Sequence, residues 1–304
     1  MNTYVKNCQL FIEYLQIEKN ASPYTVQYYQ SDLKLFHQFL QQEGIQSSHD
    51  IDQRVVRFFL TTLYDRKLSR RSVSRTISCL KSYFKFLERE HVVHNNPFMS
   101  ITLPRADKPI PGFLYEEELE KLFSANDLST PLGQRDQAII EVLYGTGIRV
   151  SECQSLAIDD INFLIGSMFI MGKGRKERYV LFGQFAEDAL QMYINDGRKK
   201  LLKNQQRTQT LFLNARGEPL TTKGIRFILK KMVERAALTV HVHPHKLRHT
   251  FATHLLNEGA DMRTVQELLG HENLSSTQIY THVTKDYLKN VYMNSHPRAK
   301  TDDT

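Results

Sequence analysis

Residues 245–260 read HKLRHTFATHLLNEGA, and residues 268–282 read LLGHENLSSTQIYTH. Pro244 suits the first turn of a helix, and Gly259 suits its end. Between them, apolar side chains recur at helical spacing: Leu247, Phe251, Leu255 and Leu256. This stretch predicts one amphipathic helix, around which the rest of the chain is organised.

Two more helices are predicted after this one. Residues 261–270 form a helix that ends at a glycine, and His271 follows at a sharp chain reversal. Ser275 or Ser276 can cap a third, short helix that carries Tyr280. The sequence thus places a histidine and a tyrosine close behind the first helix.

Four polar side chains in this region suit chemistry on a phosphodiester. His245 and Arg248 stand three positions apart, so they share a helical face and can reach one small ligand. A guanidinium matches phosphate oxygens bidentately, and imidazoles donate hydrogen bonds or move protons. The phenol of Tyr280 can attack phosphorus. Each residue alone is more often structural, so the joint order and spacing carry the inference.

A metal site is the alternative reading of the histidines that crowd this segment: His241, His243, His245, His249 and His254. Common zinc sites use spacings such as H-E-x-x-H or paired C-x-x-C, and neither occurs here. We therefore expect no metal and no cofactor.

Two upstream motifs extend the pattern. Residues 145–152 read GTGIRVSE, and residues 172–176 read GKGRK. Together with H-x-L-R-H, L-G-H and the later tyrosine, they resemble the tyrosine recombinase (phage integrase) family. The resemblance covers nearly the whole chain. In length and in the residues of its motifs, the chain is most similar to the bacterial XerC/XerD type, and more to XerC than to XerD.

The resemblance implies six catalytic residues: Arg149, Lys173, His245, Arg248, His271 and Tyr280. Tyr280 would be the nucleophile that forms a covalent 3′-phosphotyrosyl bond, and the two arginines would clamp the phosphate. Lys173 would protonate the departing 5′ oxygen, His245 would assist proton transfer at the tyrosine, and His271 would donate a hydrogen bond to the phosphate. From the residues themselves, Arg149 sits at a loop-to-helix junction, where Glu152 can orient its guanidinium.

The N-terminal part reads as four helices, and the fourth is basic. We predict DNA contacts for side chains on this helix and on a β-hairpin that carries Lys173 at its tip: Arg70, Arg71, Arg75, Lys81, Lys176 and Arg178. A solvated charged surface is the alternative for both groups. The C-terminal helix is more apolar than a free tail needs, and the resemblance implies that it docks on a neighbouring protomer.

The predicted fold class is mainly α with a small β-sheet. A helical core-binding domain at 1–90 is followed by a proline-containing linker at 91–110, an α+β catalytic domain at 111–295 and a polar tail at 296–304. The resemblance implies that the two domains form a C-shaped clamp on DNA.

Composition agrees with a DNA-binding protein inside the cell. Lys and Arg number 40 against 33 acidic residues, which gives a net charge of +7 that suits a polyanionic partner. Three separated cysteines favour a reducing compartment. We see no signal peptide and no apolar run long enough to span a bilayer, and we expect a cytoplasmic protein without a membrane.

The expected function is site-specific DNA recombination that resolves chromosome dimers before segregation at cell division, without metal or ATP. The expected partners are a double-stranded recombination site, a second, XerD-like tyrosine recombinase in a tetrameric complex, and a DNA translocase. Three alternatives stay open: a mobile-element integrase, a type IB topoisomerase and a catalytically silent DNA-binding regulator. The sequence leaves the target site, the order of strand cleavage and the activating partner undetermined.

Overall fold

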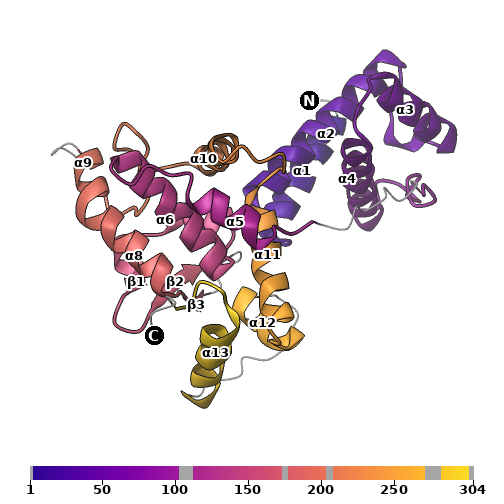
Figure 1. The fold of residues 1–304 in the computed structure, drawn as a ribbon. Coiled ribbons are helices and arrows are strands. Elements are labelled where there is room, and N and C mark those ends of the chain that lie inside the picture. Colours follow the sequence, from indigo (N-terminus) through magenta and orange to yellow (C-terminus); the bar gives the residue numbers. More distant parts are fainter. Residues whose placement is uncertain (1–2, 103–111, 173–176, 203–207, 271–281, 301–304) are drawn as a thin grey trace. The chain divides into compact units, whose positions relative to one another are not determined.

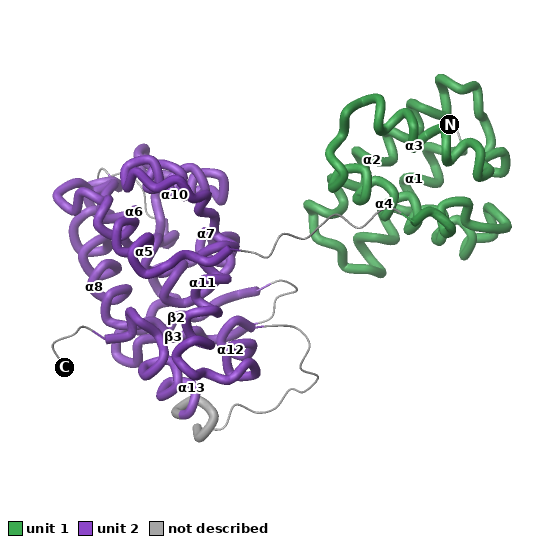
Figure 2. The backbone as a smooth tube through the Cα atoms, turned by 45° about the vertical axis from the view of Figure 1, so that its right-hand side comes forward, with its two compact units in different colours: residues 1–109 green, residues 110–304 purple. Residues whose placement is uncertain are grey.

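The computed structural model describes residues 3–102, 112–172, 177–202, 208–270 and 282–300, with side chains of the last range from Tyr287 onward. The chain divides into two compact units, residues 1–109 and 110–304 (Figure 2). The described part is mostly helical with one three-stranded sheet, which confirms the predicted fold class (Figure 1).

Unit 1 contains the four predicted helices: α1 (Thr3–Ile17), α2 (Pro23–Gln42), α3 (Gln53–Asp65) and α4 (Arg70–Arg89). A short 3-10 turn, Ser48–Asp50, precedes α3. Side chains cap three of the helices, since Ser22, Asp52 and Ser69 each accept a backbone N–H of the following first turn. The chain before each helix is thereby fixed at the point where the helix begins.

Aromatic rings dominate the core of unit 1. Phe36 packs edge-on against three other phenylalanines from different segments: Phe59, Phe84 and Phe98. All four side chains are fully buried. Edge-to-face packing of this kind adds about 0.5–1.5 kcal/mol per pair beyond burial. The helix α4 therefore presents its apolar face inward and keeps its basic residues for the other face.

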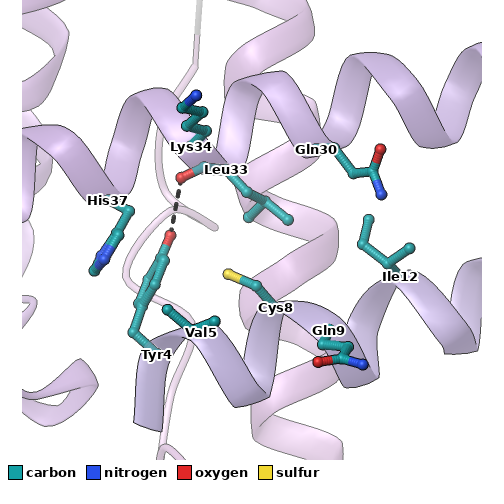
Figure 3. Close-up of a pocket in the computed structure, with 9 residues that line it drawn as sticks. All are labelled: Tyr4, Val5, Cys8, Gln9, Ile12, Gln30, Leu33, Lys34 and His37. Atoms are coloured by element: carbon teal, nitrogen blue, oxygen red, sulfur yellow. Dashed lines mark hydrogen bonds between the residues drawn. The ribbon is translucent and has the colours of Figure 1, made fainter. Parts of the chain in front are cut away.

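Helices α1 and α2 enclose a groove of about 310 Å³ (Figure 3). Tyr4 crosses one end, where its hydroxyl donates to the Leu33 carbonyl at 3.3 Å and its ring stacks on His37. Burial lowers the pKa of His37, so this ring is neutral at pH 7. Among the described residues that line the groove, Lys34 is the one side chain that is cationic at neutral pH, so these residues lack the converging charges of a phosphate site.

Replacing Ser69 tests how α4 is held at its start. Ser69→Ala removes the oxygen that accepts the Ser72 N–H at 3.2 Å, and loss of such a cap costs about 1 kcal/mol. We expect first-turn amides of α4 to exchange hydrogen roughly fivefold faster in Ser69→Ala. Ser69→Asn keeps an acceptor and should exchange like the natural chain; equal acceleration in both variants would contradict this account.

Unit 2 is built around α6 (Pro131–Thr146), which is buried along almost its whole length. The other helices of unit 2 in the described residues are α5 (Glu116–Phe123), α7 (Val150–Ser155), α8 (Gln184–Met192), α9 (Arg198–Leu202), α10 (Thr222–Arg235), α11 (Pro244–Asn257), α12 (Met262–Leu269) and α13 (His282–Ser295). The predicted helix at 245–260 is confirmed as α11, and the next one as α12 with Asp261 as its N-cap.

The three strands form an antiparallel sheet in the order β1 (Ile161–Asn162), β2 (Ser167–Met171) and β3 (Glu177–Leu181). The pairs Met168–Val180 and Ile170–Arg178 set the β2–β3 register. This confirms the predicted hairpin. The register also places Arg178 opposite a buried isoleucine, one pair before the Met171–Glu177 pair, which is the pair nearest the connection between the two strands.

The helical segment that spans residues 184–202 is interrupted. A π-helical turn, Tyr193–Gly197, separates α8 from α9. The wider turn accompanies two buried polar anchors, since the Tyr193 hydroxyl accepts the Leu213 N–H at 3.1 Å and Arg198 donates to three carbonyls of residues 208–211. These partners lie 10 to 20 positions further along the sequence, so a helical pattern alone does not reveal the turn.

The C-terminal segment packs on its own unit. The Tyr292 hydroxyl donates to the Gly145 carbonyl at 2.9 Å, and His296 and Ala299 are buried. Arg298 pairs with buried Glu141 and stacks between Phe123 and Phe185. The first part of the predicted polar tail is therefore a packed segment. Docking of α13 on a neighbouring protomer stays a prediction.

Candidate active site

The turn between α6 and α7 delivers Arg149. Helix α6 ends at Gly147, whose φ of +61° is left-handed. A Cβ there would lie 2.7 Å from Phe251 Cδ1 and 2.8 Å from Leu269 Cδ2, so no side chain fits. Arg149 follows as the N-cap residue of α7, with its side chain 36% exposed. A ligand outside the protein can therefore reach this guanidinium.

Glu152 is the buried centre of the site. Its side chain is 3% exposed and accepts the Arg149 backbone N–H at 2.7 Å and the Arg149 Nη1 at 3.0 Å. Arg178 adds two parallel bonds, at 3.0 and 2.8 Å. Burial alone would raise the pKa of Glu152, but the bonds from Arg178 and Arg149 outweigh it and hold the pKa below its usual range. The carboxylate is ionised at neutral pH.

Arg248 reaches the same place from α11. Its Nη1 donates to the Gly147 carbonyl at 2.5 Å, and its Nη2 donates to the Leu269 carbonyl at 2.7 Å. Burial, and then the charge of Arg149, lower the pKa of Arg248 to about 10, so it is still cationic at pH 7. A guanidinium has five N–H donors, and these two bonds leave others for a ligand.

The four side chains give the site an excess of positive charge. Arg149, Arg178 and Arg248 interact electrostatically with one carboxylate, Glu152, so three positive charges and one negative charge leave a net charge of two. Each of the three guanidiniums has five N–H donors and uses at most two of them in the bonds described above, and the Arg149 side chain is more exposed than that of Arg178. This arrangement suits an anion that gains charge as it reacts, such as a phosphodiester under attack.

His245 lies one turn before Arg248 on α11 and is exposed. Its neighbour His243 is the N-cap residue of the helix, where the ring Nδ1 accepts the Lys246 N–H at 3.1 Å. The sequence pattern did not identify this cap, although its place directly before Pro244 is a usable signal. The structure thus separates a capping histidine from the one that faces outward beside Arg248.

The predicted site is only partly within the described residues. Arg149, Glu152, Arg178 and Arg248 come together, and His245 is nearby along α11. Four predicted residues lie outside the described residues: Lys173, Lys176, His271 and Tyr280. His271 directly follows Gly270, the left-handed residue that ends α12.

The predicted DNA-binding residues of α4 differ in their surroundings. Arg70 and Arg71 are exposed in the first turn. Arg75 makes two bonds to buried Asp32, and the Lys81 ammonium donates to the Ile101 carbonyl at 2.8 Å. Contacts with DNA stay a prediction for all four, and the first two have the freer side chains.

Arg178 has a different place from the one that the sequence suggested. Its side chain is 14% exposed, and both terminal nitrogens bond Glu152. No sequence signal links these residues, because they stand 26 positions apart in different elements. A phosphate contact by Arg178 stays a prediction, but its guanidinium already has a partner.

A larger hollow in unit 2 is chemically unsuited to DNA. It measures about 610 Å³, and four carboxylates contribute to its lining: Glu116, Glu117, Glu118 and Glu258. Such a surface repels phosphate. Within the residues that the structure describes, no three His, Cys, Asp or Glu side chains gather as they would around a metal ion. The arginine cluster is therefore the candidate active site.

Both units match known protein families. Residues 8–91 match "Phage integrase, N-terminal SAM-like domain", and residues 112–286 match "Phage integrase family". The second match begins at the start of unit 2 and includes all six predicted catalytic positions. None of the helices in the described ranges is long and apolar enough to cross a membrane.

Relatives match over nearly the full length. The chain is 65% identical over 300 residues to Tyrosine recombinase XerC of Oceanobacillus iheyensis, covering 98% of each protein. It is 54% identical to Tyrosine recombinase XerC of Bacillus subtilis, covering 97% of this chain and 98% of that one. Among solved structures, XerH site-specific recombinase bound to palindromic difH substrate in a post-cleavage complex is similar, with 27% identity and a TM-score of 0.69; the match covers 90% of this chain and 81% of XerH.

Proposed function

This chain belongs to the phage integrase family of tyrosine recombinases, and from that premise we propose that it is a site-specific DNA recombinase of the XerC type. It would cut and rejoin DNA through a covalent 3′-phosphotyrosyl intermediate. The observation that carries the proposal is the meeting of Arg149 and Arg248, from distant parts of the chain, around one buried carboxylate.

The two arginines would stabilise the transition state. As a nucleophile attacks the phosphodiester, negative charge grows on the non-bridging oxygens, and preorganised cationic donors lower the barrier. Both guanidiniums are held before DNA arrives, Arg149 by Glu152 and Arg248 by two carbonyls. They fill the electrostatic role that divalent ions take in two-metal enzymes.

The remaining roles fall to residues that the sequence identifies. A free phenol has a pKa of about 10, so Tyr280 needs help to attack at neutral pH. His245, exposed beside Arg248, would assist that proton transfer. Lys173 would protonate the departing 5′ oxygen, and His271 would donate a hydrogen bond to the phosphate. Because the phosphoester energy is kept in the covalent bond, religation needs no ATP.

The biological role would be the resolution of chromosome dimers into monomers before segregation at cell division. The DNA partner is a double-stranded recombination site, and the protein partner is a second, XerD-like tyrosine recombinase in a tetrameric complex. A DNA translocase would act as a further partner. Since the substrate is the bacterial chromosome, the protein would work in the cytoplasm.

Salt dependence tests the predicted DNA contacts of α4. The Arg70→Ala/Arg71→Ala variant should reduce the slope of log Kd against log salt concentration by about 2, because each phosphate contact contributes about 0.9. Arg89→Ala is the control, since this arginine lies at the far end of α4 and pairs with Glu18. Equal slopes for the natural chain and the double variant would contradict the assignment.

A plasmid assay tests the function against its alternatives. The plasmid carries two directly repeated chromosome-dimer resolution sites and is incubated with this protein and the second recombinase. Recombination yields two circles. A type IB topoisomerase would only relax supercoils, a silent regulator would bind without strand exchange, and a mobile-element integrase would act on a different site. Any of these results would replace the proposal.

A further inference from the structure

Arg178 is tied to the active site by a complete ion pair. Its Nη1 and Nη2 reach the two oxygens of Glu152 at 3.0 and 2.8 Å, a bidentate geometry. Glu152 in turn bonds Arg149 through the backbone N–H and Nη1. One carboxylate therefore connects β3 with the N-terminus of α7.

The other side of Arg178 touches the end of α12. A Cβ built on Gly270 would lie 2.7 Å from both Cδ and Nε of Arg178, so the glycine backbone packs directly on this side chain. The Nε atom is buried and has no hydrogen-bond partner among the described residues. The preceding carbonyl, of Leu269, accepts from Arg248. Two arginines thus hold the last turn before position 271.

We propose that Arg178 is a positioning residue for strand cleavage. It neutralises Glu152, which leaves the Arg149 guanidinium available to the phosphate, and it fixes the β3 end of the hairpin against the end of α12. This inference rests on the proposed recombinase function. This positioning role differs from a phosphate contact, because the Arg178 side chain is only 14% exposed and both terminal nitrogens already bond Glu152.

The charge balance of the site gives the expected effect. The natural cluster holds three arginines and one carboxylate, a net charge of two. Arg178→Gln lowers the net charge to one. Arg149 is then the arginine bonded to Glu152 that compensates its negative charge. Arg149 is then drawn towards the carboxylate and away from the phosphate. The Arg178→Gln/Glu152→Gln variant returns the net charge to two and removes the unbalanced negative charge, while the amide oxygen of the glutamine can still accept the Arg149 backbone N–H that Glu152 accepts in the natural chain.

The experiment measures single-turnover cleavage of a nicked duplex and the Kd for the same duplex. Arg178→Gln should slow cleavage by roughly tenfold or more, as loss of an orienting partner does at metal sites. Its Kd and salt slope should stay near those of the natural chain. The Arg178→Gln/Glu152→Gln variant should cleave faster than Arg178→Gln alone, a non-additive result. Arg263→Ala, which breaks an exposed arginine–glutamate pair, is the matched control and should cleave normally.

A pH profile separates positioning from a purely structural role. The charged groups that act on Glu152 are Arg149 on α7, Arg178 on β3 and Arg248 on α11. In the natural chain, the bonds from Arg178 and Arg149 counteract the rise in the pKa of Glu152 that burial causes. Without Arg178 only part of this counteraction is left, so the pKa of Glu152 rises. Protonation of Glu152 then removes the competing charge, so the cleavage rate of Arg178→Gln relative to the natural chain should increase as pH falls below neutral. A constant ratio would overturn the proposal.

Other outcomes are equally decisive. A weaker Kd with a shallower salt slope in Arg178→Gln would show a phosphate contact and overturn the positioning role. If Arg178→Gln does not fold, Arg178→Lys keeps the positive charge that balances Glu152 and should cleave within a few fold of the natural rate; a tenfold or greater loss with unchanged Kd in this variant would overturn the charge-balancing role. Failure of the natural chain to cleave, with its second recombinase present, would instead overturn the proposed function itself.

Discussion

Tyr280→Phe should abolish covalent capture of DNA while leaving the Kd for the duplex within about twofold, because the change removes one hydroxyl and no charge. The missing oxygen is the atom that would form the bond to phosphorus. The measurement is a nicked duplex whose cut strand cannot religate, analysed for protein–DNA adducts, with binding followed separately.

Tyr287→Phe is the matched control for this experiment. Tyr287 lies on α13 and is 53% exposed, and within the described residues the change removes one long contact of its hydroxyl, at 3.5 Å from Asp261 Oδ2. It should form the adduct at the natural rate. A covalent adduct with Tyr280→Phe would place the nucleophile elsewhere, and loss of the adduct in both variants would indicate damage to the segment rather than to the chemistry.

Arg248→Ala should slow cleavage by about a hundredfold or more, the size expected when one preorganised donor to a transition-state oxygen is lost. The variant also leaves the Gly147 and Leu269 carbonyls without this donor, so the turn before Arg149 and the end of α12 lose a shared anchor. Single-turnover cleavage rates with saturating protein measure the effect apart from binding.

Two further variants serve as comparisons for the cleavage rate of Arg248→Ala. Arg248→Lys keeps the charge but not the fork that serves both carbonyls, and its cleavage rate should lie between those of Arg248→Ala and the natural chain. Arg263→Ala removes an arginine that is 70% exposed on the neighbouring helix and should cleave normally. A rate for Arg248→Ala within tenfold of the natural chain would contradict the assigned role.

Local patterns predicted most of the fold. The helix α11 follows from a proline, a regular apolar stripe and a glycine in sequence, and Asp261 was well placed to cap α12. The hairpin follows from short apolar runs around a glycine-rich turn. Each of these signals depends on residues within about one to four turns of each other, which is why they can be read without the fold.

Long-range pairing could not be read in the same way. Glu152 and Arg178 bond across 26 positions, and Glu141 and Arg298 pair across 157. Either arginine taken alone is an ordinary surface residue, so the sequence suggested a phosphate contact for the first and a polar tail for the second. Their burial depends on which helices and strands meet, and that is decided by the packed core of unit 2.

The most direct test of the account is the chemical identity of the covalent intermediate. The natural chain and the second recombinase are incubated with an end-labelled, nicked chromosome-dimer resolution site in the presence of a metal chelator, and the adduct is digested and analysed by mass spectrometry. The account predicts a 3′-phosphate joined to the peptide that contains Tyr280, together with a free 5′-hydroxyl end. Cleavage that requires a divalent metal, or a link through another residue or to a 5′-phosphate, would contradict it.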